Sequence, residues 1–565
     1  MFGLNNKNNA GMDNKSHLHY VLLALLLFVE VISLQWLSGS FSNEYSSFPD
    51  EAAHYVSSLM VHDYLLDGDL GNPMQFAEEY YLDYPKVAIG HWPPLFYFLL
   101  GVWFIIFGVS RITALCFMAA TSASIGLVIY AVAKSSLSTS AAIFAAVIFV
   151  AMPLSQICAN AIMLEHLVTL MMFLSVVCLA KFADNERIVY VSMFSMFAVL
   201  AIFTRGSAWS IGLVPALMML FAWRFTLLKN IFFWLSAIPV LAFCLPWYMA
   251  MPSINLGAFS DVSLFNFEFT KTAFIWFGEQ MYVQAGTVIS ILALIGFWGK
   301  IIKKYIIGEK VEIIWAALLA MFVSSYIMHI TIPAGITERY LLVTMPAIIL
   351  FAAAGIEFIV NSFTSVSSKS HIRISAYIIA GIIFGATNFY LNSIDINGYS
   401  PAYESVSNKT NNDKRVILIV SDVYGEGSIV ATAASESDKT DVTILRGSKV
   451  FVHEDWMGRN SDEKFSSVEE VTEVLKNIPV DIVIFDDEVS KKWHKNYHML
   501  LDSALNLSES NWQLVNKFPV TKYGVKHDDA LLVYVSKNIS DENMNTQSID
   551  YQLVKNLYGM DGYFE

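Results

Sequence analysis

Charged residues are scarce in this chain of 565 residues. Asp, Glu, Lys and Arg together make up 15% of the sequence, whereas hydrophobic residues make up 55%. A water-soluble domain carries about 25% charged residues, because its surface faces water. The deficit excludes an ordinary soluble protein and a disordered chain, and it predicts that much of the chain lies in a lipid bilayer.

Cysteine is also rare. The sequence has four cysteines, Cys116, Cys158, Cys178 and Cys244, and each lies within an apolar run. A thiol in such surroundings usually behaves as a small buried hydrophobic group. The pattern excludes a secreted disulfide scaffold and a cysteine-based zinc framework.

Positive charge is in the minority. The sequence has 49 Asp and Glu residues against 35 Lys and Arg residues, a formal net charge of −14, and most of this excess falls in the hydrophilic residues 391–565. A surface that binds a phosphate backbone has to be basic, so the balance argues against nucleic acid as a partner.

Long apolar runs recur from residue 18 to residue 391. Crossing about 30 Å of hydrocarbon takes roughly 20 apolar residues. The first run also resembles a signal peptide, but its length favours an uncleaved anchor. We predict about eleven membrane-spanning helices, at residues 18–37, 112–133, 140–153, 162–181, 188–204, 208–223, 230–250, 286–300, 311–331, 338–361 and 372–391.

Lysine and arginine predict the orientation. Five basic loops should be cytoplasmic by the positive-inside rule: those with Lys134, with Lys181 and Arg187, with Arg224 and Lys229, with Lys300 to Lys310, and with Lys369 and Arg373. These five loops lie on the same side of the membrane as the N-terminus only if the apolar run 93–108 does not cross the membrane. We therefore expect this run to be an interfacial or re-entrant helix that closes a long first external loop, residues 39–111. The chain is then an inner-membrane (plasma-membrane) protein with a cytoplasmic N-terminus and an external, periplasmic C-terminus.

The hydrophilic residues 392–565 predict a separate soluble α/β domain beside a membrane domain, residues 1–391. We expect strands at 416–420, 442–445, 481–485 and 531–535, and helices at 425–434 and 468–476. This alternation favours a small parallel or mixed sheet. The segment Gly425-Glu426-Gly427 is typical of an ordinary strand-to-helix turn, since the rest of a phosphate-binding fingerprint is missing.

The first external loop holds the most informative polar residues. Asp50 and Glu51 are adjacent after the first helix, and His91 lies near the end of the loop. Adjacent acids at the mouth of a membrane cavity can place one carboxylate on a reacting hydroxyl while the other organises its neighbours. The alternative is that both acids only begin a helix, where the dipole favours negative charge.

Five short motifs follow one another along residues 18–391. They are Pro49-Asp50-Glu51, His91-Trp92-Pro93-Pro94-Leu95, Phe203-Thr204-Arg205-Gly206, Pro246-Trp247-Tyr248, and Glu338-Arg339-Tyr340-Leu341 followed by Pro346. Together they resemble the membrane glycosyltransferases of the protein O-mannosyltransferase and aminoarabinose-transferase type (glycosyltransferase family 39-like), which have the GT-C fold. Their order carries the resemblance, since each motif alone is weak.

The resemblance implies a polytopic α-helical GT-C-like fold and a polyprenyl-phosphate-linked sugar as donor. It implies inverting transfer of a hexosyl or pentosyl group to a protein, lipid or polysaccharide acceptor on the external face. By position, Asp50 is implied as the general base and Glu51 as its neighbour. A hydroxyl or amine that attacks a glycosyl carbon loses a proton, whereas the departing lipid phosphate needs only positive charge.

Four residues are candidates for binding the donor phosphate: Arg205, Arg339, His91 and Lys86. Both arginines fall at external ends of predicted helices, where a guanidinium fork can bind phosphate with two hydrogen bonds. The alternative is a side chain that reaches to the interface. His91 departs from the family pattern, because Trp92 stands directly before the two prolines, where the family has histidine or lysine.

Four further residues are candidates for contacts with sugar or acceptor: His54, Tyr55, Glu165 and Glu338. His54 could instead pack, and Glu165 could merely cap a helix. Asp67-Gly68-Asp69 imitates a metal-binding motif but is typical of a turn, so no metal site is predicted, and a divalent cation is left open as a cofactor.

Two other functions compete with a glycosyltransferase. A transporter or flippase of a lipid-linked sugar commonly shows repeated halves with broken helices, and the sequence shows no such halves. A sensing module, in which the C-terminal domain binds a ligand, predicts that Asp50 is dispensable.

Overall fold

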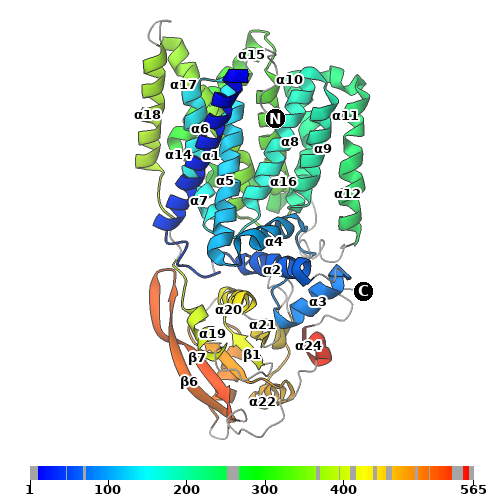
Figure 1. Ribbon diagram of the computed structural model, residues 1–565, viewed down its shortest axis with the longest axis vertical. Coiled ribbons are helices and arrows are strands. Elements are labelled where there is room, and N and C mark those ends of the chain that lie inside the picture. Colours follow the sequence, from blue (N-terminus) through cyan, green and yellow to red (C-terminus); the bar gives the residue numbers. More distant parts are fainter. Residues whose placement is uncertain are drawn as a thin grey trace. The chain divides into compact units, whose positions relative to one another are not determined.

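The computed structural model describes residues 10–45, 47–67, 71–88, 90–250, 266–363, 369–392, 395–407, 415–436, 442–453, 461–489, 494–507, 510–537 and 551–558 (Figure 1). By contacts the chain divides into two compact units. The helical unit comprises Met1–Ser38, Gly90–Phe96 and Leu115–Asn392, and the mixed unit comprises Gly39–Ile89, Tyr97–Ala114 and Ser393–Glu565. Most of the first loop therefore groups with the C-terminal residues, whereas the sequence assigned it to the membrane domain.

The helical unit is a bundle of α-helices with short 3-10 and π-helical turns. Its first half contains α1 (Ala10–Leu37), most of α5 (Arg111–Ser136), α6 (Thr139–Ala151), α7 (Pro153–Ala159), α8 (Glu165–Asn185), α9 (Ile188–Ile202), η1 (Gly206–Leu213) and α10 (Val214–Ala222). Its second half contains η2 (Phe225–Lys229), α11 (Ile231–Leu235), α12 (Ala237–Ala250), α14 (Phe267–Phe297), η3 (Trp298–Ile302), α15 (Lys303–Ile306), α16 (Ile313–Thr331), η4 (Glu338–Thr344), α17 (Met345–Phe363) and α18 (Lys369–Thr387).

Every predicted membrane-spanning segment has a helical counterpart. Among the described residues, seven helices are long and apolar enough to cross a bilayer, and the bent pair α6 and α7 makes up to eight. Three further counterparts, at 188–202, 206–222 and 371–387, are shorter apolar helices. The prediction placed one helix at 286–300, but α14 begins at Phe267 and bends at Gly286, whose φ is +75°.

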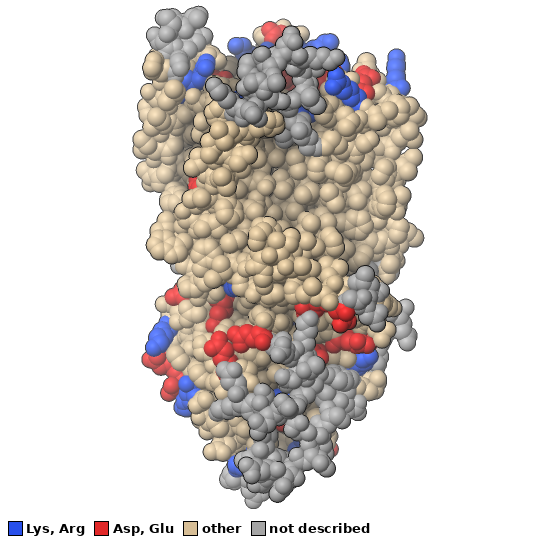
Figure 2. Space-filling view, in the orientation of Figure 1, with Lys and Arg blue, Asp and Glu red and all other residues tan. Residues whose placement is uncertain are grey.

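The surface of the helical unit fits a hydrocarbon environment. Leucine, isoleucine, phenylalanine and tryptophan side chains of α1, α11, α12 and α18 are exposed. In Figure 2 the side of the bundle is almost free of charge, and Lys and Arg gather at one end of it. A soluble protein rarely exposes so large an apolar surface, so the helical unit is an integral multi-pass membrane body.

The mixed unit contains a five-stranded mixed sheet. Its strands are β1 (Arg415–Val420), β2 (Val442–Arg446), β5 (Ile482–Asp486), β6 (Trp512–Lys522) and β7 (Val525–Ser536), in the order β2-β1-β5-β7-β6. The pairs β1–β2 and β1–β5 are parallel, and β7 pairs antiparallel with β5 and β6. The mixed sheet expected from the sequence is confirmed, and β6 is the strand that the prediction missed.

Helices and short strands complete the mixed unit. They are α2 (Glu51–Asp67), α3 (Pro73–Asp83), most of α4 (Leu95–Phe107), α19 (Tyr399–Ser407), α20 (Val423–Glu436), α21 (Gly447–Val450), β3 (Val452–His453), β4 (Asp462–Glu463), α22 (Val468–Asn477), α23 (Asn496–Leu505) and α24 (Tyr551–Tyr558). Helix α2 packs against α20, and α3 packs against β2. Leu82 of α3 belongs to the same apolar core as the strands, so the first loop and the sheet are built around shared buried surface.

Candidate functional site

Two arginines of the helical unit share one carboxylate. Glu165 is the first residue of α8, Arg205 lies between α9 and η1, and Arg339 lies in η4. The Glu165 Oε1 atom is 2.5 Å from Arg205 Nη1 and 3.5 Å from Arg339 Nε. Glu165 is buried, whereas 12% of each arginine side chain is exposed. The sequence singled out all three residues, and the structure brings them together.

Aromatic rings support the two guanidinium groups. The Arg205 Cζ atom lies 4.2 Å from the centre of the Tyr340 ring, and Arg339 Cζ lies 5.7 Å from it. The buried His329 stacks on the same tyrosine, with 5.0 Å between ring centres. Rings that hold guanidinium planes in place stabilise a cation inside an apolar bundle. Two guanidinium groups and one carboxylate leave a net positive charge, which suits an anionic ligand.

The segment before α4 is attached to the same end of α9. The Leu95 amide donates a hydrogen bond to the Phe203 carbonyl oxygen at 3.1 Å, two residues before Arg205. His91 is half-buried, and its ring centre lies 6.2 Å from that of Trp92. Glu338 opens η4 directly before Arg339 and is half-buried.

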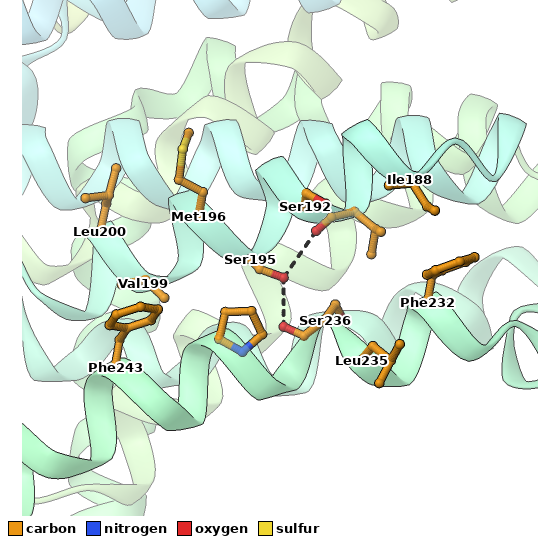
Figure 3. Close-up of a pocket in the computed structure, with 12 residues that line it drawn as sticks. Ile188, Ser192, Ser195, Met196, Val199, Leu200, Phe232, Leu235, Ser236 and Phe243 are labelled. Atoms are coloured by element: carbon orange, nitrogen blue, oxygen red, sulfur yellow. Dashed lines mark hydrogen bonds between the residues drawn. The ribbon is translucent and has the colours of Figure 1, made fainter.

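An apolar groove follows α9. It has a volume of about 390 Å³. It is lined by Ile188, Val191, Ser192, Ser195, Met196, Val199, Leu200, Phe232, Leu235, Ser236, Pro239 and Phe243, which come from α9, α11, α12 and the turn between the last two (Figure 3). The Ser195 hydroxyl donates to the carbonyl oxygens of Val191 and Ser236, so it adds little polarity to the wall. The groove begins beside Leu200, five residues before Arg205.

Asp50 and Glu51 lie at the start of α2 in the mixed unit. Glu51 is completely buried, and its carboxylate accepts hydrogen bonds from Arg111 Nη2 and from the Ser47 amide, both at 2.9 Å. Arg111 also donates to the Ser40 carbonyl oxygen. Asp50 is half-buried, and its charge acts on Lys86 and on Tyr97. The two acids therefore differ, because Glu51 is committed to an internal ion pair.

His54 and Tyr55 are buried one turn further along α2. The His54 Nδ1 atom lies 3.2 Å from the Tyr97 hydroxyl. The Tyr55 ring packs against Tyr45, with 4.4 Å between ring centres, and against the edge of Phe104 at 5.5 Å. Both side chains support the packing of α2 against α4 within the first loop.

Lys86 of the first loop is buried against α20 of the C-terminal domain. Arg446 donates hydrogen bonds to Glu426 at 2.8 Å and to the Pro85 carbonyl oxygen at 3.1 Å. Burial, followed by repulsion from the Arg446 guanidinium, lowers the pKa of Lys86 to about 7, although the Glu426 and Asp50 carboxylates oppose the shift. A lysine that changes its charge near neutral pH is a recurrent feature of functional sites.

Sequence reasoning missed several partners of these residues. Arg111 forms a buried ion pair with Glu51, and Arg446 forms one with Glu426. His329 stacks on Tyr340, the ring that both Arg205 and Arg339 contact. The local signal was a lone charged or imidazole group among apolar neighbours, as for Arg111 at the start of α5. The identity of each partner depends on contacts between distant parts of the chain.

The described residues show no group of His, Cys, Asp or Glu arranged to hold a metal ion. In the Asp67-Gly68-Asp69 segment, residues 68 and 69 lie outside the part of the chain that the structure describes. All four cysteines are free thiols.

Comparison with known proteins agrees with this architecture. Residues 91–249 match the family model for dolichyl-phosphate-mannose-protein mannosyltransferase. ArnT from Cupriavidus metallidurans bound to undecaprenyl phosphate superposes with a TM-score of 0.54 at 13% identity, over 90% of this chain and 97% of ArnT. The chain has the GT-C fold. The GT-C resemblance inferred from the motifs is thereby confirmed, and the findings support a membrane glycosyltransferase.

Two further structures extend the comparison. ArnT in the apo state has a TM-score of 0.53 at 12% identity and covers the same shares of both chains. The Archaeoglobus fulgidus oligosaccharyltransferase, tethered with an acceptor peptide, has a TM-score of 0.50 at 12% identity, over 83% of this chain and 69% of that protein. A search of curated proteins gave no match.

Proposed function

We propose that this GT-C protein transfers a hexosyl or pentosyl group from a polyprenyl-phosphate-linked sugar to an acceptor on the external face of the membrane. The observation that carries the proposal is the arginine pair around Glu165 in the helical unit, at the end of the helix that lines the apolar groove. A cation pair next to an apolar groove suits a ligand with one phosphate and a long hydrocarbon chain. The ArnT structure in complex with undecaprenyl phosphate supports a lipid phosphate of this class.

Arg205 and Arg339 bind the donor phosphate in this proposal, with His91 and Lys86 as further phosphate ligands. The phosphate is the leaving group, so its negative charge grows as the glycosidic bond breaks. Guanidinium groups that are already oriented by Glu165 and Tyr340 stabilise this charge without reorganising. The carboxylate of Glu165 limits the repulsion between the arginines while the donor is absent.

Asp50 is the proposed general base. A lone pair of the acceptor hydroxyl or amine attacks the anomeric carbon, and the bond from that carbon to the phosphate oxygen breaks. The bonding electrons stay on the phosphate, and the acceptor proton moves to the Asp50 carboxylate. A single displacement of this kind inverts the anomeric centre. Glu51, held by Arg111, keeps the start of α2 in place beside the base.

His54, Tyr55, Glu165 and Glu338 are the proposed contacts to sugar or acceptor. Glu165 pairs with both arginines, and Glu338 directly precedes Arg339 in the sequence. Both carboxylates can accept hydrogen bonds from sugar hydroxyls. The other two proposed contacts, His54 and Tyr55, lie in the buried core of the first loop. The acceptor classes compatible with this chemistry are protein hydroxyls, glycolipids and cell-envelope polysaccharides.

The decisive experiment measures glycosyl transfer in membranes with a panel of radiolabelled polyprenyl-phosphate sugars. We expect wild type to transfer one of these sugars and Asp50→Asn to lose at least 100-fold in rate, within the range of about 10²–10⁴ for a general base. Asp67→Asn is the matched control, because Asp67 ends α2 and its side chain is exposed. Wild-type transfer by Asp50→Asn would overturn the assignment of the base. Movement of a lipid-linked sugar across the bilayer without transfer would identify a flippase.

A further inference from the structure

The C-terminal sheet domain holds the first loop on both sides of Asp50. Before Asp50, the Glu44 carboxylate accepts hydrogen bonds from the backbone amides of Gly398, Tyr399 and Ser400, at 3.0, 3.1 and 3.0 Å, and from the Ser428 hydroxyl at 2.9 Å. These amides lie at the start of α19, where unpaired N–H groups and the helix dipole favour a carboxylate. Glu44 thus ties the chain six residues before Asp50 to α19 and α20.

After α2 and α3, a second connection involves buried charges. Glu426 of α20 accepts hydrogen bonds from Arg446 Nε at 2.8 Å and from the Ser448 amide at 2.9 Å. Arg446 in turn donates to the Pro85 carbonyl oxygen at 3.1 Å, directly before Lys86. The Thr443 hydroxyl donates to Asp83 Oδ1 at 2.7 Å. Strand β2 and helix α20 therefore fix the backbone that presents Lys86.

Helix α20 also packs directly on the segment that carries Asp50. A Cβ atom placed on Gly427 would lie 3.0 Å from Ala52 Cβ and 3.2 Å from Lys86 Cε. Contacts this short are tighter than ordinary van der Waals contacts, so a side chain at this position would push α2 or Lys86 away, whereas glycine allows the close approach. The segment Gly425-Glu426-Gly427, which the sequence indicated as a strand-to-helix turn, lies within α20, and Gly427 is its residue at this contact.

We infer that the C-terminal α/β domain positions the proposed base Asp50 and phosphate ligand Lys86, with Glu44 and the Glu426–Arg446 pair as positioning residues. The inference rests on the function proposed above. It assigns to the C-terminal domain a part in catalysis that no motif within that domain reveals.

The charges around Lys86 provide a readout that packing alone would not change. The groups that act on its ammonium are Arg446 and Lys449, which are positive, and Glu426 and Asp50, which are negative. Loss of the Glu426 charge makes protonation of Lys86 harder, and loss of the Arg446 charge makes it easier. The two substitutions should therefore shift the titration of Lys86 in opposite directions.

The experiment compares the pH dependence of kcat/KM for the donor in the full-length protein. For Glu426→Gln we expect the alkaline limb to move to lower pH by about one unit, and for Arg446→Gln to move to higher pH by about one unit. Ser448→Ala is the matched control, because it removes the hydrogen bond of 2.5 Å that the Ser448 hydroxyl donates to Glu426 without changing a charge. Its profile should coincide with that of wild type. Either substitution tests the inference if the other does not fold.

Glu44→Gln tests the first connection. A carboxamide nitrogen cannot accept the amide hydrogen bonds that the second carboxylate oxygen takes, so we expect kcat to fall about tenfold with an unchanged donor KM and unchanged α/β folding by circular dichroism. Glu44→Asp should recover part of kcat. Wild-type kcat in Glu44→Gln together with unshifted pH profiles in both charge variants would overturn the inference. Loss of activity in Asp50→Asn under the same conditions would show that the proposed base still holds.

Discussion

Asp50 and Glu51 are neighbours in sequence, but their carboxylates have different surroundings. Glu51 is buried against Arg111, whereas Asp50 is half-buried. Removing one partner of a buried ion pair leaves the other charge without compensation, at a cost of about 3–5 kcal/mol. We therefore expect Glu51→Gln to lower the thermal stability of the purified protein strongly. Asp50→Asn should leave stability near wild type while transfer is lost.

Thermal unfolding in detergent, followed by loss of the monodisperse species in gel filtration, measures this difference. Arg111→Met provides the complementary variant, since it leaves the Glu51 carboxylate buried without its cation and should destabilise to a similar extent. Equal stability of Glu51→Gln and Asp50→Asn would contradict the structural role of Glu51.

The lowered pKa of Lys86 predicts a pH dependence of donor binding. An ammonium with a pKa of about 7 is mostly charged at pH 6 and mostly neutral at pH 8. A phosphodiester keeps its negative charge across this range, so kcat/KM for the donor should fall as the pH rises through 7. Lys86→Arg keeps a cation at every pH of the assay, because guanidinium does not titrate there. Its alkaline decline should disappear, and an unchanged decline would exclude Lys86 as a phosphate ligand.

At the scale of whole elements, α14 and α17 show how the helical unit is packed. A Cβ atom on Gly296 would lie 1.8 Å from the Phe351 carbonyl oxygen, and one on Gly355 would lie 2.0 Å from the Leu292 carbonyl oxygen. The two backbones touch at these paired glycines, as helices in membranes often do, where close van der Waals contact replaces the hydrophobic effect. This contact fixes α17, which follows directly after η4 and its Arg339.

If the groove along α9 binds the polyprenyl chain, the KM for the donor should depend on the length of that chain. Val199 lines the groove, and Val199→Trp would occupy part of it. We expect this substitution to raise the KM for a long-chain polyprenyl-phosphate sugar about tenfold, equivalent to the loss of roughly two buried methylene groups. The KM for a short-chain analogue that reaches only the arginine pair should stay the same.

Ile231→Trp is the control for this substitution. Ile231 begins α11 and is 60% exposed, and it does not line the groove. A bulky side chain there should alter neither KM. An equal increase for both donor lengths in Val199→Trp would mean that the substitution disturbs the site itself and that the groove does not bind the chain.

Local sequence signals explain which elements could be predicted. The apolar runs of the helical unit and the buried strands β1, β2 and β5 are continuous in hydrophobicity, so periodicity and composition were enough. Strand β6 was missed because five of its eleven residues are exposed and only Val520 is buried, so it has no continuous apolar run. The first part of α14 was missed because Glu268, Lys271 and Glu279 interrupt its hydropathy.

For the whole molecule, the candidate site depends on contacts between residues far apart in the chain. The sequence indicated Glu165, Arg205 and Arg339 as separate charges, and only the fold pairs them. Glu44 meets Gly398, and Pro85 meets Arg446, across more than 350 residues. No local pattern predicts such pairs, so the association of the first loop with the C-terminal segment could not be predicted.

The predicted orientation of the chain is tested by two single cysteines. Lys310 follows α15 in a loop predicted to be cytoplasmic, and Val525 lies in β7 of the domain predicted to be external. Both residues are exposed. The apolar segments α16, η4 with α17, and α18 separate them, and an odd number of crossings places them on opposite sides. The native background is low, because Cys158, Cys178 and Cys244 are buried, and Cys116→Ser removes the half-buried fourth thiol.

A membrane-impermeant maleimide applied to intact cells should label Val525→Cys, whereas Lys310→Cys should react only after the membrane is permeabilised. Helix α18 is the critical element, because its apolar part, at 371–387, is shorter than the spans around it. If α18 lay on the surface without crossing, Lys310→Cys and Val525→Cys would react from the same side. Labelling of Lys310→Cys alone in intact cells would invert the topology and move the proposed transfer to the cytoplasmic face. Labelling of Val525→Cys alone places Asp50 outside as well, since the first loop packs on the sheet that contains β7.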